Sequence, residues 1–420
     1  MKLAEFFSRL VHSDTGDIAF TAYDGSRFGP SDAASRIHVR SPLALSYIAS
    51  APGELGMARA YVSGELEVHG DMYATLANMP DLEFGDIPAD MRLRALWRLG
   101  SARFWWPLRR PPQETHLHGR THSKIRDAEA IAHHYDVSNL FYSYVLGPSM
   151  AYTCAAYPSA AASLQTAQAV KFDLVARKLG LREGMRLLDV GCGWGGMVIH
   201  AAKHYGVRAL GVTLSEHQAQ WAQRAIAEAG VSELAQVRHL DYRDVVETGF
   251  DAVSSIGLTE HIGAANVPGY FRFLYGKLAA GGRLLNHCIT RPNGLPDSGT
   301  GPFINRYVFP DGELESPGAL VTMMHDTGFD VRHMENLREH YALTLAAWCA
   351  NLERNWTEAV AEVGSATARI WRLYMAGSRL AFERNFIALQ QILGVKPAEG
   401  GTAGMPLRPQ WEPDAAALGG

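Results

Sequence analysis

The spacing of hydrophobic and polar positions changes several times along the chain, and these changes outline the predicted elements. Beyond residue 128, short apolar runs alternate with amphipathic stretches of helical spacing. The predicted strands are Met185–Val190, Val207–Leu214, Val237–Leu240, Phe250–Ile256 and Arg283–Thr290, and the predicted helices are Met197–Tyr205, Ser215–Ala229 and Pro268–Ala280. Strands alternating with helices of this length predict βαβ units and a parallel sheet. From Tyr341 to about Leu393 the pattern is helical.

The first part of the chain has a more mixed pattern. Ile37–Arg40 and Glu65–Val68 are typical of short strands, and Pro42–Ala51 is typical of a helix. The last 25 residues hold four prolines and five glycines, a composition typical of disorder. We therefore predict an α/β protein with a smaller N-terminal α+β domain at 1–110, a linker at 111–127, a Rossmann-like domain at 128–395 and a disordered tail at 396–420.

Composition and charge exclude several classes of protein. With 47% hydrophobic and 20% charged residues, a chain of 420 residues is neither globally disordered nor fibrous. A net charge of −4 argues against a nucleic-acid-binding protein. The four cysteines form no C-x-x-C pair, so we predict reduced thiols, no metal site and a cytoplasmic protein. No apolar run is long enough to span a membrane.

The composition of one segment differs from that of the whole chain. Between Met91 and Pro112 there are six arginines and three tryptophans but no acidic residue. This pattern, from Arg92 to Arg110, is typical of a segment on an anionic membrane surface, and it predicts peripheral membrane association. The alternative is an arginine-rich connector that packs on acidic residues such as Asp81 and Asp86.

The strongest chemical signal is a glycine-rich turn, Leu188-Asp-Val-Gly-Cys-Gly-Trp-Gly-Gly196, between a predicted strand and a predicted helix. It could hold a dinucleotide, it could bind nothing, or it could hold S-adenosylmethionine (SAM). Asp189 at the strand end would repel a pyrophosphate, and the next strand ends at Ser215 without the acid that a dinucleotide ribose requires. These two features argue against a dinucleotide, and the motif Asp-x-Gly-x-Gly resembles the SAM site of Rossmann-like methyltransferases, a resemblance that implies SAM.

Topology places further candidates at the same edge, because ligands bind at the carboxyl ends of parallel strands. Thr213 and Leu214 end the second strand, Gln218 lies in the following helical turn, and Tyr242 follows the third strand. Glu260 follows the fourth strand.

Other candidates belong to the acceptor side. His287 lies near the end of the fifth strand, and Tyr341 opens a helix. Aromatic residues gather at 133–157, where they could face a sulfonium or a carbocation. A hydrophobic lid without an electrostatic role is the alternative for these aromatics.

The ordered set of these motifs resembles the cyclopropane-fatty-acyl-phospholipid synthases and the related mycolic acid cyclopropane synthases. The resemblance covers residues 134 to about 393. It rests on His-Tyr-Asp at 134–136, Tyr-Thr-Cys at 152–154, the glycine-rich turn, Gly-Val-Thr-Leu-Ser at 211–215, Glu-His-Ile-Gly at 260–263, His-x-Ile at 287–289 and His-Tyr-x-x-Thr-Leu at 340–345. Residues 60–65 resemble the N-terminal domain of the phospholipid-acting branch, which implies a lipid-related or regulatory role for 1–110 and is compatible with a homodimer.

The resemblance implies methyl transfer from SAM to the cis double bond of an unsaturated phospholipid acyl chain. A carbocation forms, bound bicarbonate removes a proton, and a cyclopropane ring closes. By motif position, bicarbonate would be held by Cys154, Glu260, His287, Ile289 and Tyr341. Glu260 would accept a hydrogen bond, His287 and Tyr341 would donate, and the other two would use backbone N–H groups. SAM would contact Tyr135, Tyr152, Thr153, Asp189, Gly191, Gly193, Thr213, Leu214, Gln218, Tyr242 and Arg243.

One departure keeps other products open. Many members of the family read Cys-Ala-Tyr, whereas this chain reads Cys154-Ala-Ala-Tyr157. A hydride shift before deprotonation would give a methylene- or methyl-branched chain in place of a ring. A methyltransferase of a soluble small molecule, and a catalytically silent protein that binds SAM or lipid, are the remaining alternatives.

Overall fold

The computed structural model describes residues 2–10, 18–51, 53–79, 108–115, 121–124, 126–127, 137–292 and 300–411. The chain divides into two compact units. The first comprises Met1–His116, Gly301–Pro310 and Leu352–Leu380, and the second comprises Leu117–Thr300, Asp311–Asn351 and Ala381–Gly420. The units are therefore not continuous in sequence, whereas the predicted domains were drawn as continuous stretches.

The first unit contains a four-stranded sheet in the order β2-β1-β3-β4, with β1 and β3 parallel. Its elements are α1 (Leu3–Leu10), β1 (Ile18–Ala22), β2 (Arg27–Phe28), β3 (Ser35–Val39), α2 (Pro42–Ser50), α3 (Glu54–Val62), β4 (Leu66–His69), α4 (Met72–Ala77) and α12 (Pro302–Tyr307). Helix α2 begins as the sequence predicts, because the Ser41 hydroxyl caps the N–H of Leu43 and Pro42 occupies the first turn. The predicted strands at 37–40 and 65–68 are also present, as β3 and β4.

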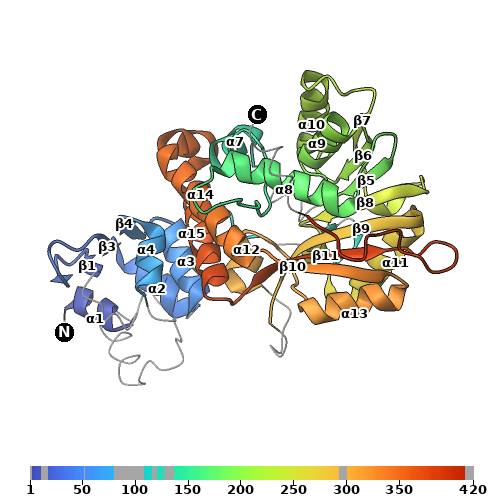
Figure 1. The fold of residues 1–420 in the computed structure, drawn as a ribbon. Helices are drawn as coiled ribbons and strands as arrows, with labels where there is room; N and C mark the ends of the chain where they lie inside the picture. The colour runs from blue at the N-terminus through green and yellow to red at the C-terminus, as the bar shows by residue number, and fades with distance from the viewer. Residues whose placement is uncertain are drawn as a thin grey trace. The chain divides into compact units, whose positions relative to one another are not determined.

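The second unit is built on a seven-stranded sheet in the order β10-β11-β9-β8-β5-β6-β7 (Figure 1). The strands are β5 (Arg186–Val190), β6 (Arg208–Thr213), β7 (Ala235–His239), β8 (Phe250–Ile256), β9 (Leu278–Thr290), β10 (Asp330–Asn336) and β11 (Ala388–Val395). The five from β5 to β9 are parallel neighbours, and β10 and β11 extend the sheet antiparallel. The predicted parallel α/β fold is confirmed.

Helices cover both faces of this sheet. On one face α8 (Leu164–Leu179), α9 (Gly196–Tyr205) and α10 (Glu216–Glu228) pack on an apolar cluster, and on the other α11 (Val267–Lys277) and α13 (Pro317–Thr327) pack on a second (Figure 1). Leu187 faces the first cluster and Leu188 the second, as alternation along a strand requires. The second unit also holds α7 (Asn139–Leu146), most of α14 (Arg338–Arg354) and the short 3₁₀ turns η2 (Tyr242–Asp244), η3 (Thr259–His261) and η4 (Ala264–Asn266). Helix α15 (Trp356–Glu383) belongs to the first unit up to Leu380, and Ala376 contributes to the apolar core of that unit.

The end of the chain differs from the prediction. The helical pattern expected up to Leu393 is wrong beyond Glu383, because β11 follows and every residue of that strand is buried. A strand covered on both faces has no polar alternation, so a short apolar run resembles a buried helix. Residues 396–411, expected within a disordered tail, are placed in the structure. Met405 and Trp411 pack against the apolar cluster beneath α8 to α10.

None of the described helices is both long enough and apolar enough to cross a membrane.

Candidate active site

The glycine-rich turn joins β5 to α9 at the carboxyl edge of the sheet. Gly191 and Gly193 have φ values of +74° and +54°, which glycine adopts without strain. A Cβ added to Gly193 would meet no atom within 4 Å, so the space beside the turn is open. The turn therefore leaves its backbone accessible to a ligand.

Asp189 lies at the end of β5 beside this turn. Its Oδ1 accepts a 2.6 Å hydrogen bond from the Ser254 hydroxyl on β8. Burial raises the pKa of Asp189 to about 6, although Ser254 and the nearby Lys171 ammonium oppose this shift. A buried carboxyl group at this position suits a cationic or amino-acid ligand, as the sequence indicated.

The end of β6 is arranged as predicted. The Thr213 hydroxyl donates a 2.7 Å hydrogen bond to Oε1 of Gln218, and both side chains are buried. The Leu214 carbonyl lies 3.0 Å from Nε2 of His239 on β7. Ser215 caps α10 by accepting from the N–H of Gln218, so the predicted helix start is confirmed.

Tyr242 and Arg243 in η2 are held by neighbours. The Tyr242 ring packs edge-on against Tyr270 and Phe273 of α11, at centroid distances of 5.1 and 5.2 Å. Arg243 donates to Asp241 and, at 3.0 Å, to Asp127. These contacts hold η2 in place, and a contact of either residue with SAM remains a prediction.

Aromatic side chains connect the turn to the acceptor side. The ring of Tyr142 lies 4.7 Å from Trp194 of the turn and 5.8 Å from Tyr152. Tyr152 in turn lies 5.3 Å from Trp348, whose ring is 6.1 Å from Tyr341. The structure thus brings together aromatic residues from α7, the glycine-rich turn, the segment before α8, and α14.

Thr153 is held by a lysine that the sequence analysis missed. The Lys171 Nζ donates to the Thr153 hydroxyl at 3.1 Å, lies 3.7 Å from the centroid of the Phe172 ring and is almost fully buried. Burial lowers the pKa of Lys171 to about 7, against the attraction of Asp189 and Cys154. Lys171 shares its helix face with the buried residues Ala167, Leu174 and Val175, and this apolar face is the signal that could have indicated its burial.

The candidate polar pair of the acceptor side is Glu260 of η3 and His287 of β9. Oε1 of Glu260 accepts a 2.6 Å hydrogen bond from the N–H of Ile289. Oε2 of Glu260 and Nε2 of His287 are buried, and neither has a hydrogen-bond partner among the described residues. Residues 287 and 289 lie on the same face of β9 because side chains alternate along a strand.

Burial sets the protonation of this pair. It raises the pKa of Glu260 to about 7, while the Ile289 N–H opposes this shift. Burial, together with the positive charges of Lys171 and Lys178, holds the pKa of His287 well below its ordinary value. At neutral pH the imidazole is therefore neutral, and the carboxyl group can exchange a proton.

The unsatisfied atoms of this pair are of the donor and acceptor types that bicarbonate requires. Its hydroxyl could donate to Oε2 of Glu260, and its oxygens could accept from His287 if Nε2 carries the proton. The Ile289 N–H donates to Glu260 in this structure, so its predicted contact with bicarbonate would require Glu260 to move.

Cys154 and Tyr341, two further residues predicted on the acceptor side, are also buried. Burial strongly raises the pKa of the Cys154 thiol, which disfavours a thiolate, and its Sγ lies 3.6 Å from the Leu337 carbonyl. The Tyr341 ring lies 4.4 Å from Phe382. The displaced Tyr157 uses its N–H to bond Nδ1 of His340 at 2.9 Å. Tyr135 and the rest of the His-Tyr-Asp motif lie outside the described residues.

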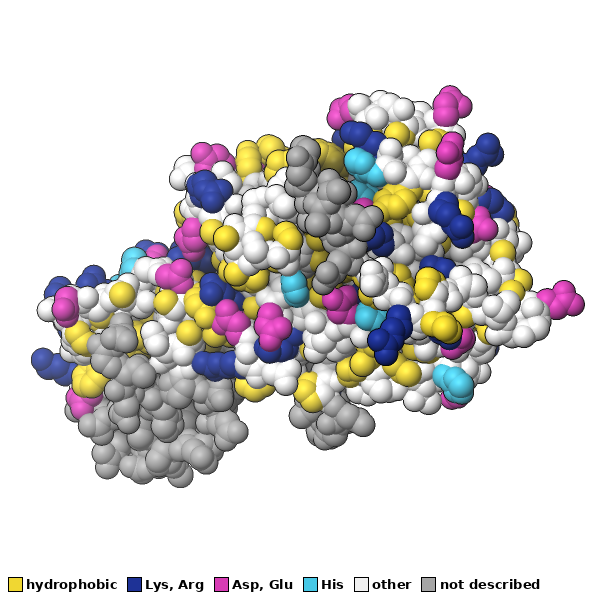
Figure 2. Space-filling view, in the orientation of Figure 1, with side chains coloured by type: hydrophobic (Ala, Val, Ile, Leu, Met, Phe, Trp, Pro, Cys, Tyr) yellow, Lys and Arg dark blue, Asp and Glu magenta, His cyan; other side chains and the backbone are white. Residues whose placement is uncertain are grey.

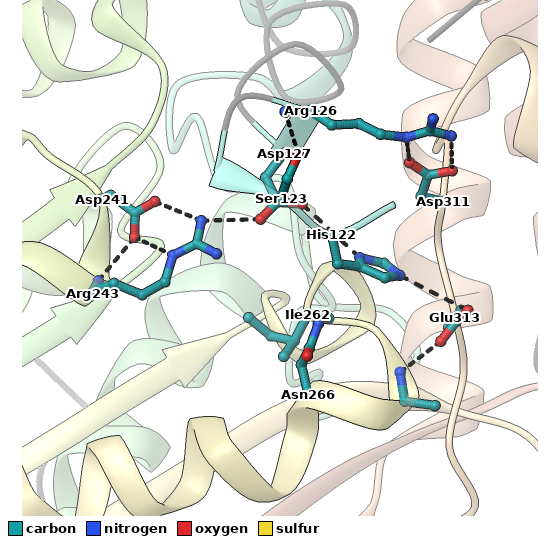
Figure 3. A network of polar contacts seen from close by, with 11 residues as sticks. His122, Ser123, Arg126, Asp127, Asp241, Arg243, Ile262, Asn266, Asp311 and Glu313 are labelled. Atoms are coloured by element: carbon teal, nitrogen blue, oxygen red, sulfur yellow. Dashed lines mark hydrogen bonds and ion pairs between the residues drawn. The ribbon is translucent and has the colours of Figure 1, made fainter. Parts of the chain in front are cut away.

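A polar network secures the loops that carry these residues (Figure 3). Nδ1 of His122 lies 4.0 Å from Oδ1 of Asp127, and Nε2 of His122 lies 3.8 Å from Oε1 of Glu313. The other carboxylate oxygen of Glu313 accepts a 2.6 Å hydrogen bond from the N–H of Ala264. The His122 ring packs so closely over Gly263 that a Cβ there would lie 2.3 Å from its Cδ2. The His122 ring and the Glu313 carboxylate thus hold Gly263 and Ala264, in the loop that follows Glu260.

The same network reaches the turn η2. Asp127 accepts from Arg243, while Arg126 forms a two-pronged ion pair with Asp311, one contact of which is 2.8 Å (Figure 3). Residues 122, 126 and 127, which lie in the predicted linker at 111–127, therefore contact the turn η2 and the segment 311–313. The described residues contain no group of three or more His, Cys, Asp or Glu side chains that could hold a metal ion.

The fold and the glycine-rich turn define a SAM-dependent methyltransferase. Residues 122–392 match the family model described as mycolic acid cyclopropane synthetase, and the chain belongs to that family. The predicted family, enzyme class and methyl donor are confirmed.

Two curated relatives and one solved structure show the range of this similarity. A "Probable fatty acid methyltransferase" of Mycobacterium tuberculosis is 52% identical, covering 98% of this chain and 99% of the relative. The cyclopropane-fatty-acyl-phospholipid synthase of Escherichia coli K12 is 34% identical, covering 64% of this chain and 68% of the relative. A mycolic acid cyclopropane synthase, solved in complex with SAH and CTAB, has a TM-score of 0.61 and 33% identity, covering 64% of this chain and 98% of that one.

Proposed function

We propose that this methyltransferase adds the methyl group of SAM to the cis double bond of an unsaturated phospholipid acyl chain and forms a cyclopropane ring. The observation that carries the proposal is the buried pair of Glu260 and His287, each with an unsatisfied atom, at the sheet edge that carries the glycine-rich turn. Ring closure requires a base that removes a proton from the new methyl group, and an anion held by these two unsatisfied atoms could supply it.

The reaction balances as follows. The bond between sulfur and the methyl carbon breaks, and one alkene carbon bonds to the methyl group, which leaves a cation on the other alkene carbon. A base then removes a proton from the new methyl group, and the electron pair of that C–H bond closes the ring. Bound bicarbonate would supply the base.

This chain's own residues would prepare that step. Glu260 would hold the bicarbonate hydroxyl, and His287 and Tyr341 would donate to its oxygens. The aromatic faces of Tyr152 and its neighbours would stabilise positive charge on the donor or the acyl chain. Exclusion of water by these buried side chains would prevent hydration of the cation.

The phospholipid and membrane part of the proposal rests on sequence and similarity. The name of the Escherichia coli relative specifies an acyl phospholipid. On the face that Figure 2 shows, basic and acidic side chains of the described residues are interspersed. The arginine–tryptophan segment is therefore the region to test, although Arg92 to Arg103 lie outside the described residues.

Reversing three of those charges tests the membrane part. Because each basic residue near an anionic surface contributes about 1 kcal/mol, Arg92→Glu, Arg94→Glu and Arg98→Glu together should weaken binding to phosphatidylglycerol vesicles at least 100-fold. Vesicle sedimentation at low and high salt measures this. Unchanged binding at low salt would refute the role of the segment.

A branched product is the second candidate. The Mycobacterium tuberculosis relative, which matches nearly the whole chain, is named as a fatty acid methyltransferase and not as a cyclopropane synthase. If the cation migrates before the proton leaves, the same site would give a methylene-branched chain.

The function is tested by incubating the purified protein with SAM and dioleoyl-phospholipid vesicles, followed by mass spectrometry of the released acyl chains. We expect oleoyl chains to gain one CH₂ unit and the matched distearoyl vesicles to gain none. Methylation of a water-soluble acceptor without lipid product would contradict the proposal.

A further inference from the structure

The side chains of Glu335, Gln391 and His287 form a row across three adjacent strands, and His287 is the member of the row that belongs to the candidate site. Glu335 of β10 is the register partner of Gln391 of β11, and Gln391 is the register partner of His287 of β9. Directly paired residues of antiparallel strands project on the same face of the sheet. Lys178, in the last turn of α8, contacts this row, and Lys178, Gln391 and His287 are all fully buried.

The row is connected by hydrogen bonds. The Lys178 ammonium donates to Oε1 of Gln391 at 2.7 Å and also pairs with the Glu335 carboxylate. Nε2 of Gln391 lies 3.1 Å from Nδ1 of His287. The other ring nitrogen, Nε2 of His287, is the buried atom without a partner among the described residues.

Donor and acceptor rules fix the direction of this chain. An ammonium can only donate, so the Gln391 atom that meets Lys178 must be the amide oxygen. The opposite end of the amide is therefore the NH₂ group, which also only donates. Nδ1 of His287 must accept, and a neutral imidazole that accepts at Nδ1 carries its proton on Nε2.

We propose that Lys178 and Gln391 are positioning residues that hold His287 in the Nε2–H tautomer, so that the imidazole presents a donor and no lone pair to the acceptor pocket. This inference deepens the proposed function. It rests on that function only for the identity of the group that accepts the hydrogen bond from Nε2 of His287. It assigns His287 to anion binding and excludes it as the base that removes the methyl proton.

The wild-type protein itself supplies the first test. In full-length protein labelled with [¹⁵N]histidine, two-bond couplings between ring nitrogens and carbon-bound protons distinguish the two tautomers. The His287 signals are identified among 17 histidines by their loss in His287→Asn. We expect a protonated Nε2 and an unprotonated Nδ1 throughout pH 6 to 8. A protonated Nδ1 would overturn the inference.

A nearly isosteric substitution provides the second test. In Gln391→Glu the neighbour of Nδ1 becomes an acceptor, so Nδ1 should gain a proton. Gln390→Glu is the matched control, because it buries a carboxyl group in the same strand with its side chain on the opposite face. The control should leave the His287 signals unchanged. If both variants or neither move the Nδ1 signal, Gln391 does not set the tautomer.

Removing the lysine tests the first link of the chain. In Lys178→Met the Gln391 amide can rotate and offer its oxygen to Nδ1, so the spectrum should show both tautomers. Loss of one donor to a reacting anion lowers kcat by about 100-fold, and partial loss should lower it by about 10-fold, with SAM affinity retained within about 3-fold. A wild-type spectrum in a folded Lys178→Met protein would refute its role.

The two proposals can fail separately. If no acyl product forms but the Nε2–H tautomer is observed, the proposed function fails and the tautomer assignment stands. If lipid product forms and His287 carries its proton on Nδ1, the assignment fails and the function stands.

Discussion

The proposed cofactor side and the proposed acceptor side of the candidate site are built differently. The cofactor side is local: Asp189, the glycine-rich turn, Thr213 and Gln218 lie within 30 residues and are ordered by one βαβ unit. The acceptor side gathers Cys154, Glu260, His287 and Tyr341 from distant segments. The acceptor chemistry therefore depends on long-range register, and the two sides should be separable by mutation.

Glu260→Gln should give the largest separation. The amide replaces the carboxylate that would hold the bicarbonate hydroxyl, so the base would be lost or misplaced and turnover should fall about 1,000-fold. SAM affinity, measured by calorimetry, should stay within about 3-fold. Glu313→Gln is the control, because it makes the same carboxylate-to-amide change in a residue that holds the same loop through the Ala264 N–H. Loss of SAM binding in Glu260→Gln would place Glu260 on the cofactor side.

Asp189→Asn should act on the proposed cofactor side, and its main effect should be a loss of SAM affinity. Removing one member of a buried charged pair costs several kcal/mol, so SAM should bind about 100-fold more weakly. Asp251→Asn is the control, because Asp251 accepts from the Arg186 N–H at the other end of the sheet and should leave the affinity unchanged. Equal effects of the two substitutions would point to general destabilisation.

The burial of Glu260 also predicts a pH dependence of stability. Its pKa rises from 4.5 in the unfolded chain to about 7 in the folded protein, so between these values the folded state holds a proton that the unfolded state has lost. The free energy of unfolding should fall by up to about 3 kcal/mol as pH rises through this window.

Urea unfolding at several pH values measures this effect. Burial also raises the pKa of Asp189, and this lowers stability with rising pH in both proteins. The difference between the pH profiles of wild type and Glu260→Gln therefore isolates the contribution of Glu260. Parallel pH profiles of the two proteins would show that Glu260 is not buried as a shifted carboxyl group.

The smallest effect concerns the network of Figure 3. Asp127→Asn weakens the contact that holds Arg243 beside the cofactor side, and SAM affinity should fall about 3-fold, the scale of a partly exposed ion pair. Asp244→Asn is the control: it also removes one carboxylate, from η2 itself, but the Asp244–Lys124 pair is half exposed, so it should have no effect. If calorimetry shows a larger loss of SAM affinity in Asp244→Asn than in Asp127→Asn, the network does not support the site.

The same contrast explains what the sequence could reveal. The turn at 188–196, the Ser215 cap and the strand ends are local patterns, and the structure contains them as predicted. Strand β11 was mistaken for helix because both of its faces are buried, and with it Gln391 was missed. Lys171 and Lys178 were also missed, because the burial of a lysine depends on partners far away in sequence.

The central claim is tested most directly by proton NMR of the acyl chains released after incubation with SAM and dioleoyl-phospholipid vesicles. Cyclopropane and methylene-branched chains have equal mass, so the spectrum must distinguish them. The account predicts high-field ring protons. Vinylidene protons without ring protons would contradict cyclopropane formation and would show that the cation migrates before the proton is removed.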